Sequence, residues 1–278
     1  SSDVCSSDLR RLEGMQEEYE RQGLDSTFIH VISGKREEQE TITGNKHYDT
    51  GYGLTRKYFK KREDILKKKY GGKYEIDVKV LNSKDYGVPQ NRERAIIKIY
   101  KKGLKWEDPI KETEINLKKA IGKLPTLESG ETSKIKYHFA RNHTEDHILW
   151  MKNTPTGKSA FQNEVYYPKK RTGERIKGFL STYKRMDWLK PSPTITMRSD
   201  AISVQSNVHP GRKRKDGTYT DARVLTLLEL FIVSSIPLSI EIDLEKYSNN
   251  FIRQIIGEAV PPLMMKKIIQ KIPEMEAK

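Results

Sequence analysis

The pattern of hydrophobic and polar residues predicts strands most clearly in two stretches of this 278-residue chain. In residues 74–80, tyrosine, isoleucine and valine occupy every second position with charged residues between them, and residues 95–100 form a second run rich in isoleucine. Alternation with a period of two places apolar side chains on one face of a strand. We therefore predict two strands here, and a third at residues 28–32, where β-branched residues lie in a short apolar run.

Apolar residues at helical spacing occupy residues 225–236 and 251–272, with proline between and within the two stretches. Proline interrupts a helix because it lacks an amide donor, so we predict helices that proline punctuates. Residues 56–70 are rich in lysine and arginine and are followed by Gly71 and Gly72, a helix stop signal. We predict a basic surface helix there.

Two long stretches lack a strong period. Residues 34–53 are polar and rich in glycine and threonine, which indicates a loop or an insertion. Residues 101–222 mix lysine, glycine, proline, serine and threonine with scattered aromatic residues, a composition typical of a loop-rich lobe. We expect this second stretch to form a domain of its own.

The composition indicates a globular protein that binds a polyanion. Hydrophobic residues make up 35% of the chain, enough for a core, and 52 Lys and Arg against 38 Asp and Glu give a formal net charge of +14. Such an excess favours nucleic acid, because cations neutralise phosphates and release counterions. No apolar run approaches the roughly 20 residues that span a bilayer, so we expect no membrane partner. The single cysteine, Cys5, excludes an intramolecular disulfide and suits a reducing cytoplasm.

The first nine residues contain the triplet Ser-Ser-Asp twice, around Val4 and Cys5, with no initiator Met and no apolar signal segment. They resemble the peptide that results when sequencing-adapter DNA is translated by mistake. We therefore treat residues 1–9 as a translated artefact and expect the natural chain to continue upstream of Arg10. A disordered natural terminus is the alternative.

The segment between the two predicted strands carries candidate chemistry and reads Tyr86-Gly87-Val88-Pro89-Gln90-Asn91-Arg92-Glu93-Arg94. Gly87 and Pro89 favour a rigid turn. Arg92 and Arg94 lie two residues apart, so in an extended segment both would project forked donors to one side, toward phosphate or a base edge. An arginine pair on a solvated strand is the alternative, since such pairs are common.

Two further blocks follow in order. The first reads Ala222-Arg223-Val224-Leu225-Thr226-Leu227-Leu228-Glu229 and leads to Ser235-Ile236-Pro237, and the second reads Gly257-Glu258-Ala259-Val260-Pro261-Pro262. Thr226 and Glu229 also match the Thr-x-x-Glu capping box, which satisfies backbone donors at the start of a helix. The second block, taken alone, could be a simple helix break.

Basic and aromatic residues accumulate between the first and second blocks, where they could bind phosphates and stack on bases, although many will be solvated surface. The basic residues are Lys134, Lys136, Lys152, Lys158, Lys169, Lys170, Arg171, Arg175, Lys177, Lys184, Arg185, Arg198, Arg212, Lys213, Arg214 and Lys215. The aromatic residues are Tyr137, Tyr166, Tyr167, Tyr183 and Trp188.

Two lookalike motifs carry no prediction. His143 and His147 are spaced like a pair of zinc ligands, but no third ligand is evident. Gly157-Lys158-Ser159 is similar to the end of a phosphate-binding P-loop, but the upstream glycine position holds Lys152. We predict neither a metal site nor an ATP site.

The three blocks, in this order, resemble those of the DNA cytosine-5 methyltransferases, whose Gln-x-Arg-x-Arg block lies between two strands. The resemblance covers roughly residues 56–272. It implies an α/β fold, namely the C-terminal part of a Rossmann-like methyltransferase sheet with an inserted loop-rich target-recognition lobe. The implied division is a remnant of the catalytic domain at residues 10–100, a target-recognition domain at 101–222, and closing helices at 223–278.

The resemblance also implies a reaction. In the family, a cysteine thiolate attacks carbon 6 of a cytosine flipped out of the duplex, a glutamate hydrogen-bonds the ring, and carbon 5 receives a methyl group from S-adenosylmethionine. The family holds the cysteine after a proline and the glutamate in a Glu-Asn-Val segment, and this sequence contains neither. Cys5 follows Val4 and lies in the suspected artefact, so we do not expect it to replace the nucleophile.

Site residues follow from the resemblance position by position. Gln90, Arg92 and Arg94 are expected to border the pocket of the flipped base, with the arginines touching phosphate or the base. Glu258, where some members have Asn, and Ala259 are expected to lie near the methyl donor. For DNA binding we expect Arg185, Arg198 and Arg223, the last of which would also support the lobe junction with Thr226 and Glu229.

Three functional readings remain open. The first is a truncated record of an active methyltransferase from a restriction-modification system, with double-stranded DNA as substrate, a cognate restriction endonuclease as a candidate partner, and an N-terminal half outside this sequence. The second is a catalytically inactive DNA-binding remnant or the recognition subunit of a split enzyme. An unrelated RNA-binding protein would match the charge but leave the three ordered blocks without a reason.

Overall fold

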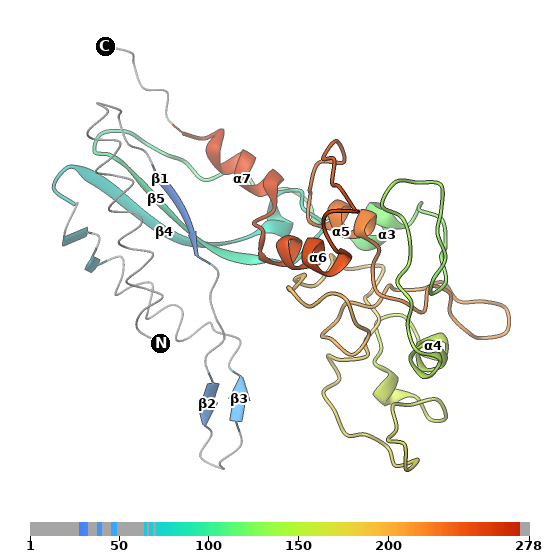
Figure 1. Cartoon of the computed structure of the whole chain (residues 1–278). Helices are drawn as coiled ribbons and strands as arrows, with labels where there is room; N and C mark the ends of the chain where they lie inside the picture. Colours follow the sequence, from blue (N-terminus) through green and yellow to red (C-terminus); the bar gives the residue numbers. More distant parts are fainter. Residues whose placement is uncertain are drawn as a thin grey trace. The chain divides into compact units, whose positions relative to one another are not determined.

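A computed structural model of the chain describes residues 71–272, together with residues 28–32, 38–40, 46–48, 64–65 and 67–68 (Figure 1). The chain divides into two compact units, and residues 82–93 and 108–271 form the second of them. The first unit contains the described residues up to 81, residues 94–107 and residue 272. The loop around Gln90 and the helices after residue 222 therefore belong to the same unit as residues 108–222, whereas the division made from the sequence separates them.

The first unit contains a three-stranded sheet in the order β1-β5-β4. The strands are β1 (Phe28–Ile32), β4 (Tyr74–Asn82) and β5 (Glu93–Lys101), and they confirm the three predicted strands. Strands β1 and β5 are antiparallel, with Phe28 opposite Ile99. Ile76 and Ile97 are buried on this sheet, as expected for β-branched residues at alternating positions.

The stretch predicted as a loop at residues 34–53 contains a second, two-stranded sheet, which corrects that prediction. Strands β2 (Glu38–Glu40) and β3 (Lys46–Tyr48) pair antiparallel. Of the helix predicted at residues 56–70, residues 64–65 and 67–68 are helical with exposed side chains, and the rest lies outside the described residues. The prediction for residues 1–9 also lies outside them.

The second unit holds short helices and long connecting segments. Its helical elements are η1 (Ser83–Tyr86), α3 (Leu117–Ile121), α4 (Glu145–Lys152), η2 (Ala160–Gln162), α5 (Leu227–Val233), α6 (Asn249–Glu258) and α7 (Pro262–Ile269). Thr226 and Glu229 form the predicted capping box at the start of α5, and a proline opens α7. The helices predicted at residues 225–236 and 251–272 are thus confirmed, as the three short helices α5, α6 and α7. No helix among the described residues is both long and apolar enough to cross a bilayer.

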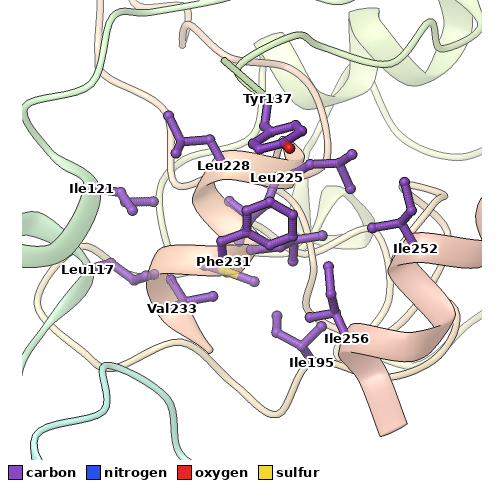
Figure 2. Close-up of a cluster of buried hydrophobic side chains, with 13 residues drawn as sticks. Leu117, Ile121, Tyr137, Ile195, Leu225, Leu228, Phe231, Val233, Ile252 and Ile256 are labelled. Carbon is purple, nitrogen blue, oxygen red and sulfur yellow. The ribbon is translucent and has the colours of Figure 1, made fainter. Parts of the chain in front are cut away.

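The core of the second unit joins residues that lie far apart in the sequence. Helix α5 packs against α3 and α6, and Figure 2 shows Phe231 of α5 among Leu117 of α3, Ile252 of α6 and Tyr137. The Tyr137 and Phe231 rings meet edge to face with centroids 5.2 Å apart, a favoured aromatic geometry. This core therefore ties residues of the predicted recognition lobe to the closing helices.

Candidate functional site

The segment at residues 82–93 forms a closed turn. Gly87 has φ 78°, in the left-handed region that glycine adopts without strain. Ser83 fastens the two arms, since its amide donates to the carbonyl of Arg92 at 2.9 Å and its hydroxyl donates to the carbonyl of Gln90 at 2.6 Å. The turn thus directs the side chains of Gln90 and Arg92 into the protein, where both are 1% exposed.

Gln90 and Arg92 connect three distant segments of the second unit. The Gln90 amide nitrogen donates to the Ser234 hydroxyl at 3.0 Å, and its oxygen accepts from the Ile195 amide at 3.3 Å. The two terminal nitrogens of Arg92 donate to the carbonyls of Ile195 at 2.7 Å and Gly257 at 2.6 Å. The three sequence blocks therefore meet around the segment that contains Ile195, although Arg92 and Gly257 are 165 residues apart.

Gly257 allows this close approach. A Cβ atom at this position would lie 2.3 Å from the backbone carbon of Thr196, a distance that real Cβ atoms do not show. Backbone bonds hold the other side of the same segment, because the Asn91 amide donates to Ser192 at 2.7 Å and the Ser192 amide donates to Pro89 at 2.9 Å. Gly257, the glycine of the last block, thus lets α6 pack closely against the segment at Thr196, and it is not a simple helix break.

A second buried group surrounds Arg223. Its guanidinium donates to both carboxylate oxygens of Glu229, at 2.8 and 2.9 Å, and to Asp221 at 2.8 Å. All three side chains are fully buried. Such bidentate, charge-assisted bonds are the strongest that arginine forms. His209 lies between the two carboxylates, 3.7 Å from each, and its Nδ1 accepts the Gly211 amide at 3.1 Å.

These contacts set the charge states of the group. Burial alone would raise the pKa of Glu229, but the Arg223 guanidinium outweighs it and lowers the pKa to about 2. Burial lowers the pKa of His209 to about 4, against the opposing pull of Glu229. At neutral pH the cluster therefore holds two carboxylates and a neutral imidazole around Arg223.

Other buried arginines also donate to backbone carbonyls. Arg185 donates to Met151 at 2.9 Å and to His209 at 2.8 Å, and burial lowers its pKa to about 10. Arg253 of α6 donates to Ser199 at 2.8 Å and Leu225 at 2.7 Å, and burial lowers its pKa to about 9. The sequence patterns did not single out Arg253, although its position beside buried Ile252 was a usable signal.

Three arginines predicted as site residues and one tyrosine predicted as a stacking face are buried. Arg92, Arg185 and Arg223 are at most 1% exposed and donate hydrogen bonds inside the protein, and their predicted contacts with DNA stay predictions. Tyr137, predicted as a stacking face, is a core residue at 4% exposure. Arg198 differs, since its side chain is 73% exposed and pairs with Asp200 at 3.1 Å.

The remaining predicted site residues have other surroundings. Arg94 is half-buried on β5 of the first unit, and burial lowers its pKa. Glu258 is exposed at the end of α6, where its carboxylate accepts from Gln254 at 3.3 Å. Ala259 caps the helix through a bond from its amide to Ile255 at 2.9 Å.

The two lookalike motifs have structural roles. His143 accepts the Val224 amide at 3.3 Å, and burial lowers its pKa to about 4. His147 instead packs against the rings of Trp150 and Tyr183, at 5.4 Å from each. Ser159 forms the capping box of η2. Within the residues that the structure describes, no group of three or more side chains could hold a metal ion.

Comparison with known proteins places the chain in a class. The sequence profile of the C-5 cytosine-specific DNA methylase family matches residues 53–274, so the chain belongs to this family. The family resemblance of the three blocks is thereby confirmed.

Particular relatives are type II methyltransferases. M1.HgaI of Avibacterium volantium is 50% identical over 210 residues, which are 76% of this chain and 58% of the relative. M1.HphI of Haemophilus parahaemolyticus is 31% identical over 205 residues, 73% of this chain and 49% of the relative. The solved structure of the Entamoeba histolytica methyltransferase EhMeth has a TM-score of 0.46 at 14% identity, over 79% of this chain and 59% of that one. The chain thus spans about half to three fifths of the length of these proteins.

Proposed function

We propose that this chain forms the DNA-recognition and closing part of an S-adenosylmethionine-dependent DNA (cytosine-5) methyltransferase of a type II restriction-modification system. The supporting observation is that the three family blocks converge in one compact unit, through the bonds of Gln90 and Arg92 to Ile195, Ser234 and Gly257. A chance occurrence of three motifs would not require them to bond to one another.

The family's nucleophile lies outside these 278 residues in this proposal. A Pro-Cys segment and a Glu-Asn-Val segment are absent from the sequence, and the chain covers 58% of M1.HgaI. We infer that further protein sequence supplies both, on the same polypeptide or on a second one. A catalytically inactive DNA-binding remnant is the second candidate, and the same absence favours it.

In this proposal the residues of this chain hold other segments in position and take no part in the chemical reaction. Arg92 and Gln90 hold the Ile195 segment against α6, and exposed Arg198 lies three residues further along the chain, where it can bind a phosphate. Arg94 stays a proposed neighbour of the base pocket.

When bound, S-adenosylmethionine supplies the electrophilic methyl group. The described residues fit one edge of such a site, because the exposed Glu258 carboxylate can accept a hydrogen bond and Ala259 adds no bulk beside it. In this proposal Glu258 helps to hold the methyl donor and takes no part in the transfer itself.

The test begins at the source locus, upstream of the codon for Arg10. The complete reading frame found there is expressed and incubated with duplex DNA and tritiated S-adenosylmethionine, and bisulfite sequencing then locates any 5-methylcytosine. We expect a frame that encodes Pro-Cys and Glu-Asn-Val and a product methylated at cytosine carbon 5.

Other outcomes separate the candidates. A stop codon upstream, with methylation only after a second polypeptide is added, would establish the split enzyme. A chain that binds duplex DNA with no methylating partner at the locus would favour the remnant. A complete frame that holds the nucleophile but transfers no methyl group would overturn the proposal.

A further inference from the structure

A basic segment of the second unit ends in an exposed apolar pair. Residues 169–180 contain five lysines and arginines and one acid, Glu174, and all six of these side chains are exposed. Phe179 and Leu180 follow at 77% and 56% exposure. In Figure 1 this stretch lies among the yellow loops below α4. Single exposed apolar residues are common, but a neighbouring pair next to such a charge cluster is not explained by packing.

The turn that carries the pair is braced on both sides. The carbonyl of Phe179 accepts two bonds from Thr182, from its amide and from its hydroxyl, each at 2.9 Å. The carbonyl of Ser181 accepts from the amide of Ser206 at 2.8 Å and from its hydroxyl at 3.2 Å. The backbone is therefore fixed while the side chains of Phe179 and Leu180 stay in solvent.

An aromatic cluster supports the base of the turn. A Cβ atom at Gly178 would lie 2.5 Å from the ring of Phe161, so the chain just before the pair is pressed against that ring. The Phe161 ring meets Tyr183, just after the turn, edge to face at 5.5 Å. Tyr183 also contacts Trp150 at 5.7 Å. These aromatic residues thus pack against one another at the base of the turn, and Phe179 is not part of their cluster.

The basic residues belong to a short hairpin next to the turn. Lys169 and Arg175 form a bridge, and the Lys170 amide donates to Glu174 at 2.8 Å. The Arg175 guanidinium lies 4.0 Å from the ring of Tyr167 and donates to the carbonyl of Asn163. Arg175 therefore fastens the hairpin, which leaves Lys169 and Arg171 to solvent.

We propose that Phe179 and Leu180 form an apolar wedge that inserts between stacked base pairs of duplex DNA, while the exposed cations Lys169, Arg171 and Lys177 bind the adjacent phosphates. Apolar side chains on a braced turn, flanked by cations, suit this task, because inserting them unstacks a base step and phosphate contacts compensate for it. Charge complementarity favours DNA over a protein partner at this surface. The inference rests on the proposed function only for its choice of duplex DNA.

The experiment uses the 278-residue chain and separates the two kinds of contact by salt. Affinity for mixed-sequence duplex DNA is measured by fluorescence anisotropy over a range of salt concentrations. We expect the double variant F179A/L180A to bind about tenfold more weakly at every salt concentration with an unchanged salt slope, since stacking contacts are not ionic. The double variant K169A/R171A should lower the slope by about 0.9 for each phosphate that is no longer neutralised.

A base analogue tests insertion directly. Randomised duplexes that carry 2-aminopurine should brighten when the chain binds, because an unstacked 2-aminopurine fluoresces more strongly, and F179A/L180A should abolish the increase. Leu189→Ala is the matched control, since Leu189 is another exposed apolar residue at 72% exposure. We expect it to change neither affinity nor fluorescence. The melting temperature of each variant should match that of the wild type, because the altered side chains are exposed.

Several results would overturn the wedge. Unchanged affinity and fluorescence in F179A/L180A would do so, and so would a loss of self-association in place of a loss of DNA binding, which would assign the pair to a protein interface. The proposed function is tested separately by methyl transfer. A chain that inserts the wedge without methylation in the complete frame would overturn only that function.

Discussion

Four arginines of the second unit and the basic residues of its hairpin look alike in the sequence but lie in opposite environments. Arg92, Arg185, Arg223 and Arg253 are buried and donate to carbonyls or carboxylates, whereas the cations of residues 169–171 are exposed. Between η2 and α5 the described chain forms no helix and only isolated bridges. Backbone carbonyls there lack the partners of regular structure, and buried arginines supply several donors each. Such arginines therefore hold together segments that have no regular secondary structure.

Replacing Arg223 should have the largest effect on the free energy of unfolding. Arg223→Ala leaves Glu229 and Asp221 buried without their main cation, and we expect a loss of about 3–5 kcal/mol in the free energy of unfolding. Urea unfolding followed by circular dichroism measures it. A loss below about 1 kcal/mol would show that the two carboxylates are not held by Arg223, since exposed pairs contribute that little.

Arg92 should come second. Arg92→Ala removes the donors to the carbonyls of Ile195 and Gly257, and at about 1–2 kcal/mol for each, the lower part of the cost of a buried acceptor left without a donor, we expect a loss of about 2–4 kcal/mol. Arg92→Lys, which keeps the charge but lacks the fork, should be intermediate. If both variants unfold like the wild type while methylation by the complete enzyme fails, Arg92 contacts DNA and the structural assignment is wrong.

Acid should lower the free energy of unfolding by an amount similar to that expected for Arg92→Ala, because it acts on the buried cluster. The pKa of His209 is about 4 in the folded state, below its ordinary value, so between about pH 6.5 and pH 4 the unfolded chain binds a proton that the folded chain does not. The free energy of unfolding should therefore fall by about 2 kcal/mol between pH 7 and pH 5. The pKa of His143 is also lowered to about 4, so His143 should add a decrease of the same sign. His209→Asn, which keeps an acceptor but cannot titrate, should remove the part of the decrease that comes from His209.

The smallest effect should come from Arg198, which represents the exposed class. Its ion pair with Asp200 is 73% exposed on the arginine side, so Arg198→Ala should change the free energy of unfolding by less than about 0.5 kcal/mol. DNA affinity should fall, and its salt slope should drop by about 0.9 if Arg198 neutralises one phosphate. Equal salt slopes for variant and wild type would remove Arg198 from the DNA-binding surface.

Local patterns predicted part of the regular structure. Alternation located β4, a run rich in isoleucine located β5, and helical spacing with proline located α5, α6 and α7, but α3 and α4 were missed. These signals succeed because the period of buried side chains is fixed by the geometry of one element. The β2–β3 pair was missed, since its residues are polar and carry no apolar alternation.

The sequence predicted only part of the candidate site. The motifs identified the three blocks, but the sequence could not show which way their arginines point. The partners of Arg92 lie 103 and 165 residues away, and the charge of a residue does not tell whether its side chain meets solvent or a distant carbonyl. The exposure of Phe179 was missed for the same reason, because an aromatic residue in a loop-rich region is as readily a core residue, as Tyr137 is.

The second unit is discontinuous in the sequence, and this affects any attempt to exchange the proposed recognition lobe between relatives. The chain enters this unit at residue 82, leaves it after 93, returns at 108 and leaves again after 271. A transplant of residues 108–271 alone would leave behind Gln90 and Arg92, and with them the donors for Ser234, Ile195 and Gly257. A working chimaera therefore has to carry both stretches from the same parent, as a two-piece graft.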